Sequence, residues 1–314
     1  MDNKILILLM SCNSQLYRDS EQACRETFIT DAEKAGVRYY FYRGDAEETS
    51  INDETHEMLF PVNDNLAGTA RKTILAFKEA LKLEDWDYIV KTNVSTWLDV
   101  RKIQKAVNAW EGREDLNIYG ARFLVNSASK NVPFPRGHFL ILSRKLVEGI
   151  VEWGPRFIGA KDFPRTDDTL LCLSLLYYVQ KILGDNYQSR LTEVPSVISW
   201  SEEIQDSVDW GDALSVRCKD ETDGTNTPDH LRKTHKLKRT KNLTRTYRRP
   251  VRMFETKYGT MAYDTYIKTD TIIETVKARE KEAATIEQDR DDKLLKIREM
   301  LDAIRTKNEN GTKQ

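Results

Sequence analysis

Short apolar runs alternate with amphipathic stretches along the first part of the chain. Ile5 to Met10 is continuously apolar, which is typical of a strand buried on both faces. The next stretch predicts an amphipathic helix that stops at Gly36. Its apolar positions are Ala23, Phe28, Ala32 and Ala35. Residues 37–42 are rich in β-branched and aromatic side chains and predict a second strand. This alternation predicts an α/β fold with a central, mostly parallel sheet and flanking helices.

The same alternation continues through the middle of the chain. A helix is expected after the loop at 59–64, with Asn63 or Asp64 as its cap. Residues 88–98 begin as an apolar strand, break into a polar cluster and resume as helix. Ligands in open α/β sheets bind beyond the carboxyl ends of the strands, so Asn93 and Ser95 are candidate ligand contacts. The alternative is an ordinary turn in which Asn and Ser cap the local backbone.

Five segments resemble, in order along the chain, the Fringe-like β-1,3-glycosyltransferases. Residues 91–96, Lys-Thr-Asn-Val-Ser-Thr, are similar to the Lys-Thr-Asp-Asp-Asp-Thr run of that family. Residues 23–28, 72–73, 133–144 and 166–170 are similar to its first helix, its Lys-Thr pair, its glycine-rich acceptor loop and its Asp-Asp element. The resemblance covers residues 4–200 and fades beyond them.

The resemblance implies a GT-A-like domain that binds a nucleotide-sugar. It also implies transfer of a sugar from that donor, a UDP-sugar, to a hydroxyl acceptor with inversion. The residues expected to contact the donor are Ser11, Arg25, Lys72, Asn93 and Ser95. Gly137 permits close approach of the backbone to a ligand, and it would shape the acceptor side together with His138. On pattern alone, Arg25 and Lys72 are equally compatible with solvated helix surfaces, and His138 with a structural role.

Two adjacent carboxylates precede a leucine-rich helical run. An inverting transfer needs a base that accepts the proton of the acceptor hydroxyl. Asp168 is the expected base and Asp167 is the alternative. The simpler interpretation is that both residues only cap the helix that follows.

The acidic triplet that holds the metal ion in the family is missing. Asn93, Val94 and Ser95 stand in its place. The resemblance implies Mn²⁺ or Mg²⁺, whereas such ions prefer carboxylate oxygen to these neutral groups. Metal dependence therefore stays open at the level of sequence.

Composition excludes a global attraction to nucleic acid or membrane, because 49 basic and 50 acidic residues nearly balance among 314. Four cysteines without CxxC spacing indicate a reducing compartment. The run at 5–10 has six residues, whereas a membrane span needs about 20, so neither an anchor nor a signal peptide is expected. Golgi members of the family carry an anchor. We therefore expect a cytoplasmic enzyme of a bacterium or a virus-infected cell.

Composition also divides the chain into three parts. The expected catalytic domain covers 1–215, an acidic loop and a basic segment cover 216–262, and a charged helical tail covers 263–314. The tail would cover the catalytic domain or pair between subunits in a homo-oligomer. Ten Lys or Arg residues and no acidic residue occupy 232–252. Candidate phosphate or nucleic-acid contacts there are Lys236, Lys238, Arg239, Lys241, Arg245 and Arg248.

The basic segment leaves three interpretations open. It would clamp the donor diphosphate in place of a metal ion, or bind the backbone of a DNA or RNA acceptor, or pair with acidic parts of its own chain. The acceptor is accordingly a glycan or a modified base in viral DNA. The competing function is a non-catalytic nucleic-acid-binding protein on a degenerate glycosyltransferase scaffold. An Asp168→Asn change separates the two, because only the enzyme would lose its function.

Overall fold

The computed structural model describes residues 4–110, 117–121, 123–124, 134–158, 167–183, 191–197, 213–219 and 224–240. The chain divides into two units after Tyr266, and all of the described residues belong to the first unit, Met1–Tyr266. The predicted helical tail and its proposed oligomer contacts lie outside the described residues.

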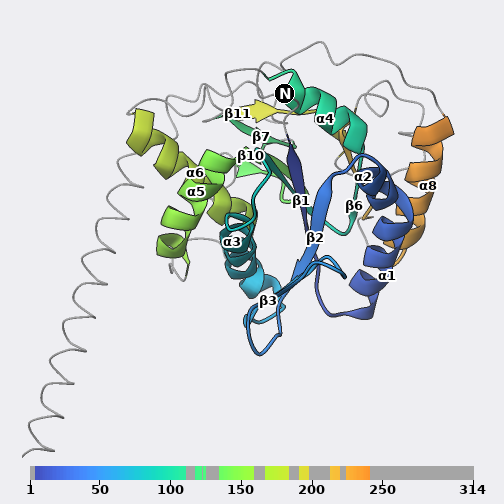
Figure 1. Cartoon of the computed structure of the whole chain (residues 1–314), viewed down its shortest axis with the longest axis horizontal. Coiled ribbons are helices and arrows are strands. Elements are labelled where there is room, and N and C mark those ends of the chain that lie inside the picture. The colour runs from blue at the N-terminus through green and yellow to red at the C-terminus, as the bar shows by residue number, and fades with distance from the viewer. Residues whose placement is uncertain are drawn as a thin grey trace, which may run out of the picture. The chain divides into compact units, whose positions relative to one another are not determined.

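The described residues form an eight-stranded sheet in the order β11-β7-β10-β5-β1-β2-β4-β3 (Figure 1). All of its strands run parallel to β1 except β10 and β3. The strand bounds are β1 Ile5–Met10, β2 Arg38–Arg43, β3 Ser50–Asn52, β4 Glu57–Leu59, β5 Tyr88–Asn93, β7 Ile118–Gly120, β10 Phe139–Ser143 and β11 Leu191–Glu193. The predicted mostly parallel α/β sheet with flanking helices is confirmed.

Helices cover both faces of this sheet (Figure 1). On one face lie α1 Gln15–Cys24, its continuation as a π-helix Arg25–Ile29 and α2 Thr30–Lys34, α4 Val100–Asn108 and α8 Thr227–Thr240. On the other face lie α3 Thr69–Ala80, α5 Arg144–Trp153 and α6 Asp167–Leu183. Two 3-10 turns, Leu66–Gly68 and Gly154–Phe157, precede α3 and follow α5. None of the helices described is long and apolar enough to cross a membrane.

Two smaller sheets adjoin the main one. The first has the order β12-β13-β6, from Ser196–Val197, Ser215–Arg217 and Thr96–Leu98. The second pairs β8 Phe123–Leu124 with β9 Phe134–Pro135. The first small sheet joins three distant parts of the chain directly beyond the end of β5.

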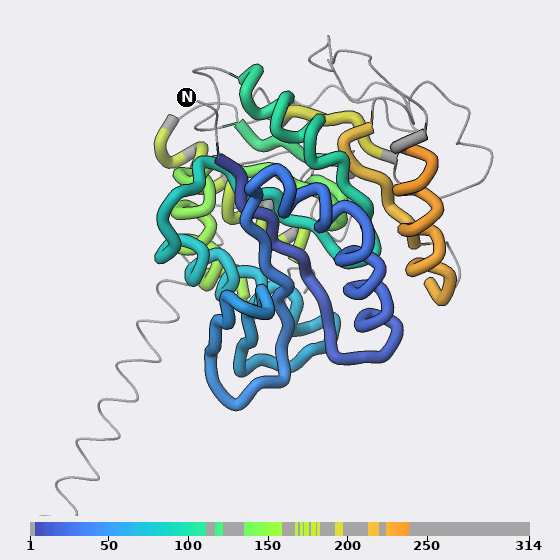
Figure 2. The backbone as a smooth tube through the Cα atoms, turned by 45° about the vertical axis from the view of Figure 1, so that its right-hand side comes forward, coloured from blue at the N-terminus to red at the C-terminus, as the bar shows by residue number. Residues whose placement is uncertain are grey.

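The core explains why β1 forms where its sequence predicts. Leu6 to Leu9 have no exposed surface, because helices pack on both faces of this central strand. Apolar side chains of α1, α4 and α8 share one cluster with the strand, and Leu231 brings α8 into it. The view in Figure 2 shows α8 alongside α1, and these two helices are in contact. The part of the basic segment that lies in α8 therefore packs on the sheet domain.

Three local predictions can be compared with the structure. Gly36 follows α2 with a φ of +66°, as its predicted role at a helix end requires. The predicted helix after Ser95 is wrong at its start, because Thr96–Leu98 pairs with β13 and the helix begins only at Val100. The predicted caps before the helix at 69–80 are also wrong: the side chain of Asn65 accepts the amide of Gly68 at 3.0 Å.

Candidate functional site

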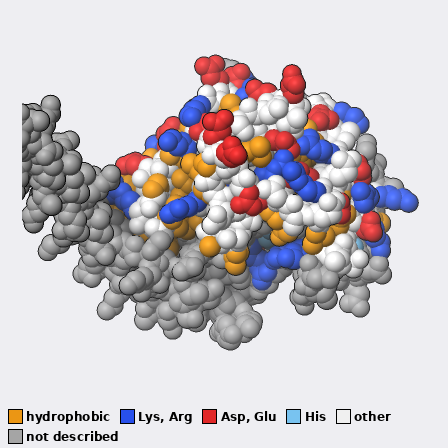
Figure 3. Space-filling model, turned by 90° about the horizontal axis from the view of Figure 1, so that it is seen from below, with side chains coloured by type: hydrophobic (Ala, Val, Ile, Leu, Met, Phe, Trp, Pro, Cys, Tyr) orange, Lys and Arg blue, Asp and Glu red, His pale blue; other side chains and the backbone are white. Residues whose placement is uncertain are grey.

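The sheet has a switch point between β1 and β5. The chain leaves β1 for β2 on one side, and β5 returns on the other side, with Met10 and Asn93 paired at their carboxyl ends. The amide of Val94 donates to the carbonyl of Met10 at 3.1 Å and keeps the two ends together. Crevices at such switch points are where ligands bind in open α/β sheets. We call the ends of β1 and β5, with the residues that directly follow them, the switch-point crevice, a name for a place in the sheet topology. Figure 3 views the molecule from the side on which these strands end, where Lys and Arg side chains lie among Asp and Glu side chains.

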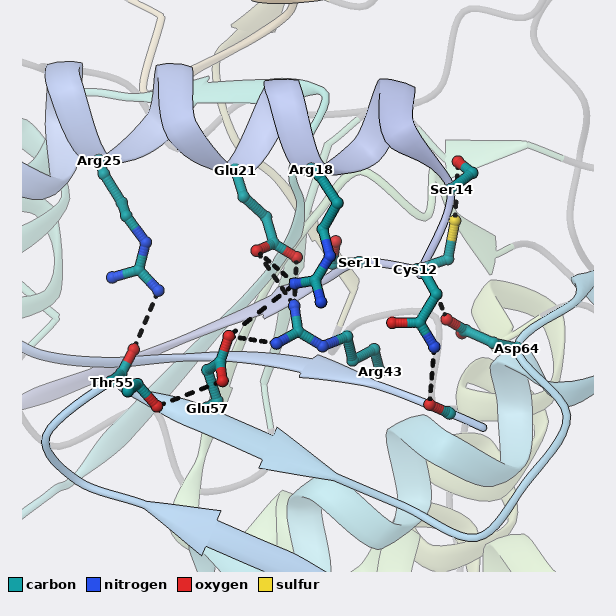
Figure 4. Close-up of polar contacts among 12 residues, drawn as sticks. Ser11, Cys12, Ser14, Arg18, Glu21, Arg25, Arg43, Thr55, Glu57 and Asp64 are labelled. Atoms are coloured by element: carbon teal, nitrogen blue, oxygen red, sulfur yellow. Dashed lines mark hydrogen bonds and ion pairs between the residues drawn. The ribbon is translucent and has the colours of Figure 1, made fainter. Parts of the chain in front are cut away.

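The loop after β1 lies on one side of the switch-point crevice, and Lys72 and Asp64 bond to its backbone. The buried ammonium group of Lys72 donates to the carbonyl of Ser11 at 2.6 Å and to the carboxylate of Asp64. Asp64 also accepts the amide of Asn13 at 2.8 Å, a contact drawn in Figure 4. The Asp64 side chain is only 1% exposed, so this ion pair is buried. Lys72 and Ser11, both predicted as donor contacts, are thus brought together, with Lys72 bonded to the loop.

A buried ionic network joins α1 to β2 and β4 beside this loop (Figure 4). Arg43 Nη1 donates to both carboxylate oxygens of Glu21, at 2.9 and 3.1 Å, and Nη2 donates to Glu57. Arg18 pairs with Glu21 at 3.2 Å. Burial raises the pKa of Glu21, and the Ser11 hydroxyl and Arg18 oppose this rise. Because each buried charge has a partner, the network fixes the start of α1 beside the crevice.

Arg25 lies further along the same helix and makes different contacts. Its guanidinium group donates to the carbonyl of Thr55 at 2.9 Å (Figure 4). The same group lies 4.4 Å from the ring centroid of Phe41. These contacts place Arg25 over the middle of β2 and the β3–β4 turn. The structure therefore does not bring Arg25 together with the other predicted donor contacts at the ends of β1 and β5.

Lys91 joins the segments that the sequence assigned to the donor, the acceptor and the base. Its ammonium group donates to Gly137 O at 2.6 Å and to Asn93 Oδ1 at 3.2 Å, and it forms an ion pair with Asp167. Lys91 is 1% exposed. An ammonium group has three protons to donate, and each of these acceptors takes one. The end of β5, the loop before β10 and the first residue of α6 therefore meet at one buried charge.

Asp168 lies directly against Gly137. A Cβ atom added at Gly137 would stand 3.2 Å from both Cβ and Oδ2 of Asp168. Asp168 is half-buried, whereas Asp167 is buried and paired with Lys91. The two neighbouring carboxylates thus occupy different environments at the start of α6.

His138 is buried in a chain of hydrogen bonds that leads to the small sheet. Its Nε2 lies 3.0 Å from Ser196 Oγ, which lies 2.6 Å from Ser215 Oγ. Burial, together with repulsion from the positive charges of Arg217, Arg136 and Lys91, lowers the pKa of His138 to about 3. The imidazole is therefore neutral at physiological pH.

Two arginines near His138 were missed from the sequence. Arg217 ends β13 opposite Thr96, and the amide of the next residue, Cys218, donates to the carbonyl of Ser95 at 2.8 Å. Arg136 immediately precedes Gly137. The sequence does carry a signal for Arg217: Leu214, Val216 and Cys218 alternate with polar residues, the period of a strand with one buried face. The predicted domain boundary at 215 falls within this strand, so the strand was not predicted.

The end of β5 does not supply the ligands that a divalent cation prefers. Asn93 and Ser95 are half-buried neutral groups, and the side chain of Val94 is buried in the core. The nearby carboxylate of Asp167 is paired with Lys91. Among the described residues, no group of three or more His, Cys, Asp and Glu side chains is arranged to hold a metal ion. This donor set does not fit a tightly held Mn²⁺ or Mg²⁺.

The basic residues predicted to contact phosphate are separated along α8 and beyond it. Lys236 is exposed. Lys238 is buried, donates to the carbonyl of Ala213 at 3.2 Å and lies 5.6 Å from the ring centroid of Trp97. The backbone of Arg239 belongs to α8. The remaining candidates, Lys241, Arg245 and Arg248, lie outside the described residues.

A pocket of about 600 Å³ opens beside the carboxyl ends of β2 and β4. Asp64 separates it from the loop after β1, because its side chain accepts from Asn13 while its own amide donates to Asp45 at 2.9 Å. The pocket is lined by Asp45, Ala46, Glu47, Pro61, Val62, Asn63, Asn65, Ala67, Gly68 and Arg71.

No family model and no curated protein matches the chain in sequence. Among solved structures, a glycosyltransferase involved in glycosylation of the major capsid of PBCV-1 is 13% identical, with a TM-score of 0.44 over 73% of this chain and 99% of that one. The galactosyltransferase LgtC, in complex with donor and acceptor sugar analogs, is 9% identical, with a TM-score of 0.41 over 77% and 97%. A197 from STIV is 12% identical, with a TM-score of 0.30 over 61% and 81%. Similarities of this size do not define the activity of this chain.

Proposed function

We propose that the protein is a glycosyltransferase of the GT-A type that moves a sugar from a nucleotide-activated donor, a UDP-sugar, to a hydroxyl acceptor. Lys91 carries this proposal. It holds the predicted donor segment at Asn93, the predicted acceptor segment at Gly137 and the predicted base segment at Asp167 around one buried ammonium group. These three segments lie far apart in the sequence and meet at the switch-point crevice.

The donor would bind across the ends of β1 and β5. Ser11 and the start of α1 line one side, and Asn93 and Ser95 line the other. The amino end of a helix carries free amides and a partial positive charge, which favour a phosphate group. A nucleotide-sugar whose diphosphate lies in this place would have its transferable sugar facing the loop that contains Gly137.

Asp168 would act as the base. Its carboxylate takes the proton of the acceptor hydroxyl while the hydroxyl oxygen forms a bond to the anomeric carbon. The bond from that carbon to the diphosphate breaks at the same time, and the nucleoside diphosphate leaves with the bonding electrons. Attack opposite the leaving group inverts the anomeric configuration. Asp167 is less suited to this step because Lys91 already occupies it.

His138 would position the reaction site and would not exchange protons, because a pKa of about 3 keeps it neutral. Its contact with Ser196 ties the loop at Gly137 to the small sheet. The acceptor would be a glycan or a modified base in DNA. The basic segment beyond α8 would favour the second of these by attracting the phosphate backbone.

A panel of nucleotide-sugars tests the proposal. The wild type should release free nucleotide slowly from one donor, and Asn93→Ala and Ser95→Ala should weaken the binding of that donor by about tenfold each, the effect of one lost hydrogen bond in a buried site. Arg38→Gln, at the exposed amino end of β2, is the matched control and should leave binding unchanged. If no donor is bound or hydrolysed, with or without Mn²⁺, the proposal fails. Nucleic-acid binding by the basic segment then becomes the better account.

A further inference from the structure

Arg217 is a positively charged residue of the small sheet beside the switch-point crevice, and it is not among the donor contacts proposed above. Ser215 and Arg217 lie two positions apart on β13, so their side chains leave the strand on the same face. Ser215 Oγ contacts Ser196 Oγ at 2.6 Å, and Ser196 leads to His138. Arg217 therefore projects toward the side of the small sheet on which His138 lies.

The positive charge of Arg217 acts on groups on both sides of the switch point. Arg217 opposes the burial-driven rise in the pKa of Tyr17, in the first turn of α1. It also lowers the pKa of His138, which burial depresses first. One charge thus reaches the α1 side and the β10 side. The side chain of Arg217 forms no hydrogen bond or ion pair with another of the described residues.

Two buried polar atoms near Arg217 have no hydrogen-bond partner within the described part of the chain. They are Thr96 Oγ1, on the residue paired with Arg217, and His138 Nδ1. Thr96 has no exposed surface, and His138 is 2% exposed. Buried polar atoms in native proteins nearly always have a partner, so these two indicate that a ligand or water completes the site. A polar, partly anionic ligand would satisfy them and the guanidinium group together.

We infer that Arg217, assisted by Arg136, binds the diphosphate of the donor in the place that a divalent metal ion would otherwise take. The inference rests on the proposed function and names the chemistry of its donor site. Guanidinium groups suit this role, because their N–H groups bond two phosphate oxygens at once and keep their charge at any physiological pH. The positive charge would also stabilise the diphosphate as it leaves. The neutral residues at the end of β5 fit this arrangement and do not fit a metal site.

Titration with nucleoside diphosphates and with inorganic pyrophosphate tests this inference. The wild type should bind one nucleoside diphosphate in EDTA about as tightly as in Mn²⁺. Arg217→Gln should weaken that binding by about tenfold or more, the effect of losing a charge-assisted hydrogen bond, and should leave binding of the uncharged nucleoside unchanged. Arg217→Lys keeps the charge and should lose less. Arg232→Gln, on the exposed side of α8, removes an arginine elsewhere and should have no effect.

The outcomes separate the two proposals. Binding that disappears in EDTA, returns with Mn²⁺ and is unchanged in Arg217→Gln overturns the role of Arg217 and leaves the glycosyltransferase proposal standing. Absence of binding to every nucleoside diphosphate and nucleotide-sugar, with or without metal, overturns both. If Arg217→Gln does not fold, wild type in EDTA and the Arg217→Lys variant decide the question. Chelator-resistant binding that Arg217→Lys weakens supports the inference, and chelator-sensitive binding contradicts it.

Discussion

The ammonium group of Lys91 and the carboxylate of Asp167 form a buried ion pair across 76 residues of sequence. Lys91 is the fourth residue of β5, and Asp167 is the first residue of α6. The pair anchors the start of α6 against the central sheet and leaves the next residue, Asp168, beside Gly137. This relationship ties Asp167 to the central sheet and gives the two adjacent carboxylates different surroundings.

Breaking the Lys91–Asp167 pair should destabilise the fold. Removal of one partner leaves an uncompensated buried charge, so Lys91→Met should lower the free energy of unfolding by about 3–5 kcal/mol. The double variant Lys91→Met, Asp167→Asn should lose less than the sum of the single variants. Urea unfolding measures all of these values. The exposed pair Arg232–Glu26 is the control, and its loss should cost less than about 1 kcal/mol. Strict additivity of the two buried changes would show that the pair does not couple.

His138 should make the fold sensitive to acid. Its pKa is about 3 in the folded protein, against 6.5 for an unperturbed histidine. The unfolded chain therefore binds the proton first, and stability that is fully present above pH 6.5 is lost as the pH falls toward 3. A shift of this size corresponds to roughly 5 kcal/mol over the whole window. Urea unfolding of the wild type and of His138→Gln between pH 7 and pH 4 checks this, because the variant should show the shallower decline. Equal slopes would mean that His138 is not held neutral.

Gly137→Ala should impair transfer more than stability. The added Cβ would stand 3.2 Å from the Asp168 side chain, so that carboxylate must shift by a few tenths of an ångström. A small misplacement of a base costs rate, and a loss of about tenfold or more in kcat is expected with little change in Tm. Steady-state kinetics and a thermal melt give both values. Gly68→Ala is the contrasting variant, because its Cβ would stand 1.8 Å from the carbonyl oxygen of Asn63 and should destabilise the fold. Unchanged kcat in Gly137→Ala would contradict the expectation that transfer depends on the exact position of the Asp168 carboxylate.

α8 should contribute to the core of the sheet domain. Leu231 has no exposed surface and packs in the cluster that contains α1 and β1, so Leu231→Ala should destabilise by about 2–5 kcal/mol. Lys233→Ala, on the exposed side of the same helix, should change stability by about 0.5 kcal/mol or less. Denaturant unfolding compares the two. Equal small effects would show that α8 is an appendage of the domain.

Local patterns in the sequence were sufficient for the central elements of the fold. β1 is continuously apolar because helices cover both of its faces, and that pattern is visible without a structure. Gly36 stands where a left-handed residue must end a helix. The start of α6 at Asp167 also follows from two acidic residues before a leucine-rich run. In each case, the signal lies within a few residues of the element.

Contacts between distant segments were not visible in the sequence. β6 is a three-residue strand that exists because β13 pairs with it, so its own residues resemble the start of a helix. The helical pattern left a solvated surface and a ligand contact equally compatible for Lys72, whereas its ammonium group bonds to the distant Ser11 and to Asp64. The position of Arg217 near His138 follows only from the pairing of β13 with β6 and β12. These features depend on residues that are distant in sequence, so the local pattern of apolar and polar residues does not predict them.

The rate of nucleotide release by Asp168→Asn tests the central claim most directly. With the preferred nucleotide-sugar at saturation, we expect a fall in rate of about 10²–10⁴-fold, the usual contribution of a general base. The affinity for the donor and the Tm should match the wild type, because Asp168 is half-buried while Asp167 keeps the ion pair to Lys91. Release at the wild-type rate by a folded Asp168→Asn protein would contradict the assignment of Asp168 as the base.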